Sequence, residues 1–338
     1  MAARRVEIIA EAGVNHNGDV AIAHKLVDVA AQSGADAVKF QTFDPALLVS
    51  DSAPKAEYQI ANTGGAQNQR QMLEALALPH SAFKELADHA REAGILFLST
   101  PFDERSADFL EELGCPAFKV ASGEITNHRL LRVLAAKQRP LLMSTGMATM
   151  AEVADAVIVV RESGNRELAL FHCVTNYPAQ PKDCNLAAMD SMRTLFECPV
   201  GWSDHTDGIA VSVAAAAMGA ELLEKHFTLD RNMEGPDHPA SLEPDELAEM
   251  VRAVREAQSA RGSAIKRPAP SELANISVVR RSLHAARNLG RGHALSAEDL
   301  VLLRPGGGIP AQEERRVIGR TLTRAVVAGE RIEESDVG

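Results

Sequence analysis

The chain has 338 residues, of which 46% are hydrophobic, and it carries a formal net charge of −11 at pH 7. This length and apolar content allow a large core, and the negative charge argues against broad electrostatic binding to nucleic acid or to an anionic membrane surface. An anionic ligand would therefore have to meet a local cluster of positive side chains.

The cysteines and the apolar stretches indicate a cytoplasmic protein. The four cysteines show neither the paired spacing of a metal site nor a secreted disulfide framework, so we expect reduced thiols. The first residues, MAARRVEIIAEAG, lack the long apolar segment of a signal peptide. The most apolar helical stretch, residues 209–223, is too short to span a membrane. We therefore predict cytoplasmic localisation and no membrane association.

Eight short runs rich in Val, Ile, Leu and Phe recur over the first three quarters of the chain. They lie at residues 6–13, 37–43, 95–101, 117–123, 140–146, 168–174, 199–205 and 222–228. Helical periodicity separates most of them, as in residues 20–34, 81–94 and 150–164. Near-continuous apolar strands alternating with helices imply a parallel sheet covered by helices, and eight such units fit a closed (β/α)8 TIM barrel. No GxGxxG follows the first run, which weakens a dinucleotide-binding alternative.

Each run begins apolar and gains polar or ionisable groups toward its carboxyl end. Examples are Glu11, Lys39, Gln41, Thr100, Lys119, Ser122, Ser144, His172, Ser203, His205, Glu224 and His226. In a barrel these ends meet at one rim, where active sites lie. Strand ends that merely reach water would explain Ser and Thr. Lys39 and Lys119, however, have apolar neighbours, and a buried charge needs compensation. We favour an anionic ligand shared by both lysines over two unrelated structural ion pairs.

The two histidines at the ends of the seventh and eighth runs, His205 and His226, should lie side by side on adjacent strands. By strand alternation, Glu224 shares a face with His226, and Ser203 shares one with His205. Two imidazoles could hold one divalent metal and leave open positions for water and substrate oxygens. A hydrogen-bonded pair of histidines at the rim is the alternative, and spacing alone does not decide between them.

The pattern changes after residue 262. Residues 263–277 contain Pro and Ser and few large apolar side chains, which is typical of a linker. Residues 288–300 (NLGRGHALSAEDL) then match residues 325–337 (AVVAGERIEESDV) at equal spacing. We therefore predict a barrel domain at 1–262, a linker at 263–277 and a small pseudo-symmetric β-rich module at 278–338. The module is short enough that we expect little core of its own.

A series of motifs in this order and spacing resembles the sialic acid synthase family. The motifs are IIAEAGVNHNGD, VKFQTF, STPFD, KVASGE, MSTGM, HCVTNYP, WSDHT, EKHFT and GPDHPASLEPDEL. The tail RRSLHAARNLGRGHALSAEDLVLLRPGGGIP resembles the carboxyl-terminal antifreeze-like (β-clip) domain of that family. The resemblance covers essentially the whole chain.

The resemblance implies a metal-dependent enzyme that condenses phosphoenolpyruvate with an N-acetylated mannose-type sugar. It would form a carbon–carbon bond, release phosphate and give a nine-carbon 2-keto acid. The metal would be Mn²⁺, or Mg²⁺ or Co²⁺, bound by His205 and His226, which would act in catalysis together with Glu11. The positions expected to bind phosphoenolpyruvate are Lys39, Thr100, Lys119, Ser122, Ser144 and Ser203. Those expected near the acceptor sugar are Gln41, Tyr177, Asp237 and Arg304.

In the family, the residue at the position of Arg304 reaches the sugar from the other subunit of a domain-swapped homodimer, so we expect such a dimer here. A solvated surface arginine is the alternative. Three positions depart from the family pattern or match it loosely. Asn17 replaces a Glu and could alter acceptor contacts, Thr175 replaces an Asn, and Asn62 lies in a segment expected to form a loop over the sugar.

The sequence itself does not choose the acceptor sugar, and our prediction is N-acetylmannosamine, which would make the chain an N-acetylneuraminate synthase. The alternative acceptor is 2,4-diacetamido-2,4,6-trideoxymannose, the precursor of legionaminic acid, or a spore-coat polysaccharide sugar. A third interpretation takes the tail as an ice- or carbohydrate-binding module without catalysis. The lysines, the histidines and Glu11 argue against it, because all the groups that the chemistry needs are present.

Overall fold

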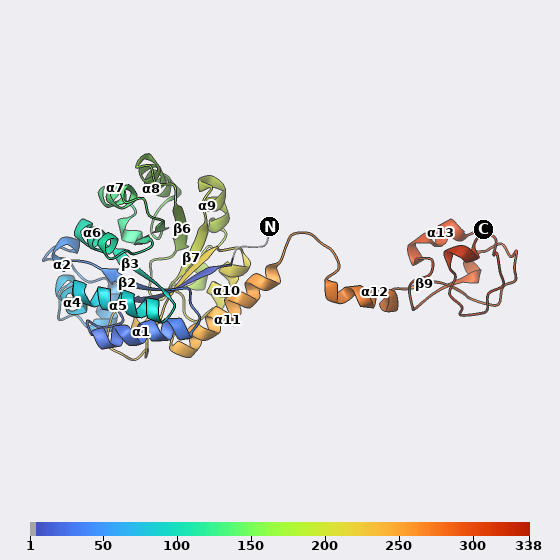
Figure 1. Ribbon diagram of the computed structural model, residues 1–338, viewed down its shortest axis with the longest axis horizontal. Coiled ribbons are helices and arrows are strands. Elements are labelled where there is room, and N and C mark those ends of the chain that lie inside the picture. Colours follow the sequence, from blue (N-terminus) through green and yellow to red (C-terminus); the bar gives the residue numbers. More distant parts are fainter. Residues whose placement is uncertain (1–4) are drawn as a thin grey trace. The chain divides into compact units, whose positions relative to one another are not determined.

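The computed structural model describes residues 5–338, which form two compact units, one ending at Gly262 and the other spanning Ser263–Gly338. The first unit is a closed barrel of parallel strands in sequence order, in which the last strand pairs with the first (Figure 1). The strands are β1 (Glu7–Gly13), β2 (Ala37–Thr42), β3 (Leu96–Pro101), β4 (Phe118–Val120), β5 (Leu141–Ser144), β6 (Leu168–Cys173), β7 (Val200–Asp204) and β8 (Leu222–His226). This confirms the predicted (β/α)8 barrel.

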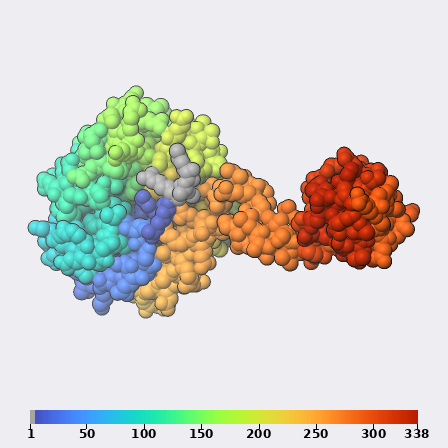
Figure 2. Space-filling view, turned by 45° about the vertical axis from the view of Figure 1, so that its right-hand side comes forward, coloured from blue at the N-terminus to red at the C-terminus, as the bar shows by residue number. Residues whose placement is uncertain are grey.

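The strands are almost continuously apolar because both faces of the sheet are covered. Ile8, Val38 and Phe118 are fully buried, and the helices contribute apolar side chains such as Leu26 and Leu86 to the same core. Figure 1 shows the helices arranged around the strands, and the space-filling view in Figure 2 shows the closely packed atoms of this unit on one face. Burial on both faces is what the near-continuous apolar runs predict.

Helices follow the strands, and several begin at a side chain that satisfies their free N–H groups. The helices are α1 (Val20–Gln32), α2 (Pro45–Leu48), α3 (Glu57–Thr63), α4 (Gln69–Leu76), α5 (His80–Glu92), α6 (Glu104–Glu112), α7 (His128–Ala136), α8 (Met150–Glu162), α9 (Ala188–Phe196), α10 (Ala210–Ala217) and α11 (Pro244–Arg261). Asp19 accepts hydrogen bonds from the first N–H groups of α1, and Thr149 with Glu152 forms a capping box at α8.

The segment between β2 and β3 contains α2, α3 and α4 before α5 packs against the barrel. The sequence analysis predicted a loop over the sugar for part of this segment, which matches the family pattern only loosely. The structure has short helices there instead. They matter for function because they lie beside the carboxyl ends of the first strands.

The second unit has β9 (Ser282–Ala285) paired antiparallel with β10 (Leu300–Leu303), and the short helix α13 (Glu314–Val317). The two matching sequence repeats meet directly, since Leu289 and Val326 exchange N–H···O hydrogen bonds of 2.9 and 3.0 Å. Our expectation of little core was wrong. Because the repeats interlock, apolar side chains from both, including Leu295 and Ile332, form a buried cluster.

The helix α12 (Leu273–Val279), none of whose side chains is buried, begins inside the segment 263–277 that we predicted as a linker and ends two residues beyond it. Helix α12 was not predicted. Short 3₁₀ turns complete the chain at Ser122–Glu124, Pro181–Asp183, His238–Ala240, Pro270–Glu272, Ala297–Asp299, Ala311–Glu313 and Glu334–Asp336.

No helix within residues 5–338 is both long enough and apolar enough to cross a membrane.

Candidate active site

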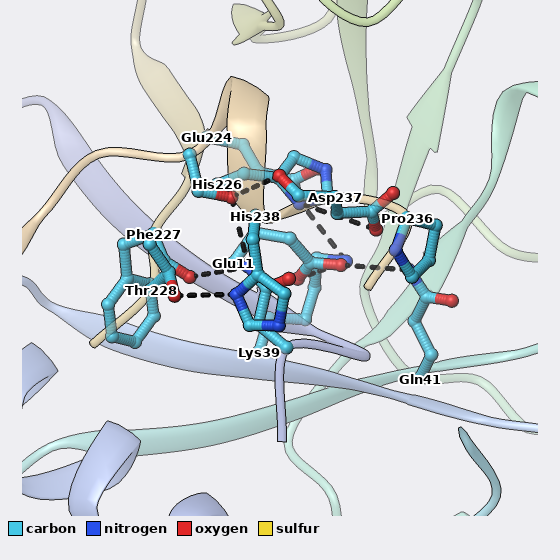
Figure 3. A network of polar contacts seen from close by, with 12 residues as sticks. Glu11, Lys39, Gln41, Glu224, His226, Phe227, Thr228, Pro236, Asp237 and His238 are labelled. Atoms are coloured by element: carbon cyan, nitrogen blue, oxygen red, sulfur yellow. Dashed lines mark hydrogen bonds and ion pairs between the residues drawn. The ribbon is translucent and has the colours of Figure 1, made fainter. Parts of the chain in front are cut away.

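The carboxyl ends of the barrel strands open into a pocket. The residues of the first unit that we assigned to catalysis, to the metal, to phosphoenolpyruvate or to direct sugar binding all line it. These residues are Glu11, Lys39, Gln41, Thr100, Lys119, Ser122, Ser144, Tyr177, Ser203, His205, His226 and Asp237. The parallel register explains why the polar ends coincide: Glu11 pairs with Lys39 on one side and with His226 on the other. Figure 3 shows part of this network of polar side chains.

The centre of the pocket is a network of buried lysines and glutamates. Lys39 Nζ lies 2.7 Å from Glu11 Oε2 and 3.8 Å from Glu224 Oε2, and Lys119 Nζ lies 3.2 Å from Glu224 Oε1. The two ammonium groups also donate to hydroxyl oxygens, Lys39 to Thr100 at 2.9 Å and Lys119 to Ser144 at 2.6 Å. The protein's own carboxylates therefore compensate the lysines that we expected an anionic ligand alone to balance.

The two glutamates of this network have opposite pKa shifts. Burial raises the pKa of Glu11 to about 7, although Lys39 acts in the other direction. Burial would also raise the pKa of Glu224, but the Lys119 and Lys39 ammonium groups outweigh it and lower that pKa to about 2. Near neutral pH, Glu224 is therefore ionised and Glu11 is partly protonated. Burial lowers the pKa of Lys119, whereas at Lys39 the Glu11 and Glu224 carboxylates outweigh burial and raise the pKa. Protonation of Glu11 removes a negative charge that would repel an anionic ligand.

The two predicted imidazoles lie together beside this cluster. The ring centroids of His205 and His226 are 5.6 Å apart, and the Tyr177 ring lies 4.3 Å from that of His205. His205 Nδ1 is 2.7 Å from the carbonyl oxygen of Val174 and must donate to it, which leaves Nε2 with a free lone pair. Burial lowers the pKa of His205 to about 4 and that of His226 well below its usual range. Both rings are therefore neutral near pH 7.

A family model for NeuB matches residues 26–266, and a model of the SAF domain matches residues 280–338. The chain belongs to the NeuB family. It is 46% identical over 333 residues to the N,N'-diacetyllegionaminic acid synthase of Campylobacter jejuni, covering 98% of this chain and 100% of the relative. It is 36% identical over 330 residues to the N-acetylneuraminate-9-phosphate synthase of Homo sapiens, covering 97% and 91% of the two chains.

Among solved structures, the sialic acid synthetase of Leptospira borgpetersenii is similar with a TM-score of 0.73 and 33% identity, covering 80% of this chain and 90% of that one. These findings confirm the resemblance to the sialic acid synthases and to their antifreeze-like domain. The chain is thus an enzyme of the NeuB family, whose members condense phosphoenolpyruvate with an acetylated amino sugar. The non-enzymatic interpretation is set aside.

The imidazole pair of this NeuB-family chain has the properties of a metal site. Both rings are neutral, His205 Nε2 is free, and His226 Nδ1 is buried without a hydrogen-bond partner in the described structure. Neutral imidazole is the form that binds divalent cations. Among residues 5–338, no three His, Cys, Asp or Glu side chains are arranged to hold a metal. A bound ion would therefore take its other ligands from water and substrate.

Glu224 is the main functional residue that the sequence analysis left without a role. It lies on the pocket face of β8 with His226, as alternation predicts, and it accepts from Lys119 and from Ser203. Lys225 points to the other face and pairs with Asp204 at 3.4 Å. The signal was present in LLEKH, since Glu224 stands two residues before His226. The sequence could not show that both lysines converge on it.

The loop that carries Asp237 is held by a set of hydrogen bonds from the first βα loop. Asn17 Nδ2 donates to the carbonyl of Glu234 at 2.8 Å, and Asn17 Oδ1 lies 3.2 Å from His238 Nε2. Asn17 does not line the pocket, so its expected influence on acceptor contacts stays a prediction and would act through this loop. Asn62 behaves similarly and donates to the carbonyl of Pro236 at 2.6 Å. Both asparagines position the Asp237 loop.

Asp237 itself reaches the pocket, where its Oδ2 lies 3.9 Å from His226 Nδ1. Burial raises the pKa of Asp237 to about 6. Tyr58 of α3, which the sequence gave no reason to select, stacks on Tyr177 with ring centroids 5.0 Å apart. The stacked pair and Asp237 form the border of the pocket next to the imidazoles.

Thr175 also lines the pocket, and its hydroxyl oxygen is buried with no hydrogen-bond partner in the described structure. A Cβ atom at Gly146 would lie 2.1 Å from this oxygen and 2.8 Å from Ser122 Oγ, so only glycine fits there. Arg304 lies in the second unit, directly after β10, and its side chain is exposed. Its contact with an acceptor sugar stays a prediction.

Proposed function

We propose that the chain condenses phosphoenolpyruvate with 2,4-diacetamido-2,4,6-trideoxymannose to give N,N'-diacetyllegionaminic acid and phosphate. The cluster of Lys39, Lys119 and the ionised Glu224 beside two neutral imidazoles is the observation that carries the reaction. The choice of acceptor rests on the 46% identity to an N,N'-diacetyllegionaminic acid synthase, against 36% to an N-acetylneuraminate-9-phosphate synthase. These relatives favour the alternative acceptor over N-acetylmannosamine.

The lysine cluster suits phosphoenolpyruvate, which carries a phosphate and a carboxylate. Lys39 and Lys119 would supply positive charge, and hydroxyl groups around them would supply directed donors. The hydroxyl groups available are Thr100, Ser122, Ser144, Thr175 and Ser203. Binding of phosphoenolpyruvate would draw the ammonium groups of Lys39 and Lys119 away from Glu11 and Glu224. Those carboxylates would then be free to exchange protons with the reacting groups.

His205 and His226 would hold a divalent metal, with Mn²⁺ as the expected ion. When bound, the metal would polarise the acceptor aldehyde as a Lewis acid. The Val174 carbonyl keeps His205 in the tautomer that presents Nε2, and burial keeps both rings neutral. Asp237, 3.9 Å from His226, would orient that ring or an acceptor hydroxyl.

In the reaction, C3 of phosphoenolpyruvate would attack the aldehyde carbon and form the new carbon–carbon bond. Water would add to C2, and the tetrahedral intermediate would break its C–O bond to release phosphate. Glu11 is suited to move the protons, because its pKa of about 7 lets it both accept and donate near neutral pH. Its Oε1 is 3.3 Å from the amide of Gln41, which fixes the direction of the carboxyl group.

The experiment incubates the protein with phosphoenolpyruvate, Mn²⁺ and either the diacetamido sugar or N-acetylmannosamine. Phosphate release gives kcat/KM, and mass spectrometry identifies the nine-carbon acid. We expect at least about tenfold higher kcat/KM with the diacetamido sugar, and no release when the metal is chelated. A preference for N-acetylmannosamine, or no reaction with either sugar, would overturn the proposal.

A further inference from the structure

One side of the active-site pocket is lined by apolar side chains, which we call the apolar wall. The side chains of the wall come from the loop after β1, from the last residue of α2 and the one that follows it, from the residue that follows β3, and from α4. Its members are Val14, Leu48, Val49, Met72, Leu73, Leu76 and Phe102. Nothing in the reaction described above uses them.

The rest of the pocket has the opposite character. The lysines, the serines and the imidazoles come from the ends of the barrel strands, whereas the wall comes mostly from the segment inserted between β2 and β3. A substrate that fills the pocket therefore meets both charged groups and hydrocarbon. The reacting atoms belong with the charged groups, which leaves the wall for the part of the acceptor that does not react.

The wall is fixed to the barrel. Met72 and Leu76 are buried with Val14 in a small apolar cluster of their own. Gly18 comes so close to α4 that a Cβ atom there would lie 2.6 Å from the carbonyl oxygen of Ala75. Gly18 also has a φ of +75°, which favours glycine. Helix α4 is therefore packed directly against the first βα loop of the barrel.

We propose that the apolar wall selects the acceptor by receiving its C6 methyl group and the methyl of its 4-acetamido group. This inference rests on the proposed function and names the residues that set its specificity. Gln69, at the first turn of α4, borders the wall and carries an amide that can pair with the acetamido group.

The physical basis is the difference between a methyl group and a hydroxyl against hydrocarbon. Burial of a methyl group lowers the free energy of binding through the hydrophobic effect. A buried hydroxyl loses its hydrogen bonds to water and finds no partner on Leu48, Val49 or Leu73. N-acetylmannosamine carries hydroxyls at C4 and C6, where the proposed acceptor carries the acetamido group and a methyl. An apolar pocket rejects an added hydroxyl only by about 100-fold, which sets the upper range of the effect.

The test replaces wall residues with a polar side chain of similar size, in Leu48→Gln and Leu73→Gln. The matched control is Leu47→Gln, because Leu47 is the neighbour of Leu48 on α2 but is 49% exposed and does not line the pocket. Each variant is assayed by phosphate release with the diacetamido sugar, with N-acetylmannosamine and with 6-deoxy-N-acetylmannosamine. The last sugar separates the contribution of the methyl group from that of the acetamido group.

We expect kcat/KM for the diacetamido sugar to fall about tenfold or more in both wall variants, while that for N-acetylmannosamine changes by less than about threefold. KM for phosphoenolpyruvate should stay constant, and the control should behave as wild type. If a glutamine variant fails to fold, Val49→Thr provides the same readout with almost no change in shape.

Three results would overturn the inference. Equal losses for both acceptors would show that the wall does not discriminate between them. The same change of ratio in Leu47→Gln would show that the effect does not come from the wall. Wild-type protein that does not use the diacetamido sugar would overturn the proposed function as well. The first two outcomes leave the proposed function intact, so the two failures can be told apart.

Discussion

The carboxylates of the second unit and those of the barrel pocket are both buried, but their surroundings differ. In the second unit, Asp299 accepts hydrogen bonds from the N–H and the hydroxyl of Ser296, both at 2.9 Å, and pairs with Arg287 at 2.7 Å. The second repeat places Asp336 in the same arrangement with Arg324. The pKa of both aspartates lies below its usual range. For Asp299 the cause is a set of hydrogen bonds, of which that from His293 is the largest. For Asp336, hydrogen bonds from Arg324 and from a backbone N–H outweigh the effect of burial.

In the pocket, Glu11 and Asp237 have too few donors to balance their burial, and their pKa values are raised to about 7 and about 6. The comparison separates the two aspartates of the second unit from Glu11 and Asp237 of the pocket, whereas Glu224 is functional although Lys119 and Lys39 lower its pKa to about 2. In the second unit, the carboxylates whose acceptor positions are filled hold the fold together. A buried carboxylate with few hydrogen-bond donors destabilises the fold when it is ionised. It can still accept hydrogen bonds from a substrate or from a metal-bound water.

The largest expected effect comes from removing a lysine of the pocket. Lys119→Ala should lower kcat/KM by about 10³-fold or more, because an electrostatic donor to the anionic substrate is lost. It should also lower the free energy of unfolding by about 3 kcal/mol, since Glu224 would keep a buried charge with fewer partners. Steady-state kinetics and urea unfolding measure the two effects.

Arg324→Ala is the control from the second unit, because this guanidinium is 46% exposed and pairs with Asp336. It should lower the free energy of unfolding by less than Lys119→Ala does and leave kcat unchanged, because an exposed ion pair is screened by solvent. If Lys119→Ala kept near-normal activity, the lysine cluster would not be the phosphoenolpyruvate site.

A smaller effect is expected from Glu11→Gln, which keeps the shape and removes the titratable group. Turnover should fall about 10²- to 10³-fold, because the amide cannot accept a proton. Mn²⁺ affinity, measured by calorimetry, should change little, since His205 and His226 are retained. Unchanged turnover would remove Glu11 from the catalytic residues, and lost Mn²⁺ binding would make it a metal ligand instead.

The barrel and most of the pocket could be predicted from the sequence. Both follow from the order of the strands and from the alternation of side chains between the two faces of each strand. Once β7 and β8 are adjacent, His205 and His226 must meet, and Glu11 must face Lys39 across the β1–β2 pair. These consequences need only the period of two and the parallel register. The same alternation places Glu224 and its neighbour Lys225 on opposite faces of β8, where Lys225 pairs with Asp204.

Contacts between distant loops could not be predicted in the same way. That Asn17 binds the carbonyl of Glu234 rather than a substrate depends on how two irregular segments fold against each other. The helices α2 and α4 were not anticipated either, because α2 has only 4 residues and the segment that leads into α4 matches the family pattern only loosely. The sequence likewise could not show whether the lysines are neutralised by a ligand or by Glu11 and Glu224.

The smallest expected effect tests the carboxylate comparison directly through pH. Asp237 has a pKa of about 6 in the folded protein and 3.8 as its ordinary value. Stability should therefore fall as pH rises between these values, because the folded state binds the proton more tightly. In metal-free protein, Asp237→Asn should raise the free energy of unfolding by roughly 2–3 kcal/mol at pH 8. The gain should shrink through pH 6 and disappear near pH 4.

Asp299→Asn should behave in the opposite way, since hydrogen bonds led by that from His293 hold the pKa of Asp299 below its ordinary value. A depressed carboxyl pKa contributes stability above the unfolded value of 3.8 that is lost as pH falls through the folded pKa. The variant should therefore be destabilised at pH 8 and still destabilised at pH 4. Urea unfolding at pH 4, 6 and 8 distinguishes the two patterns. A loss of stability at pH 8 in Asp237→Asn would mean that this carboxylate also holds the fold, and the distinction between carboxylates with filled acceptor positions and those with few hydrogen-bond donors would not apply to it.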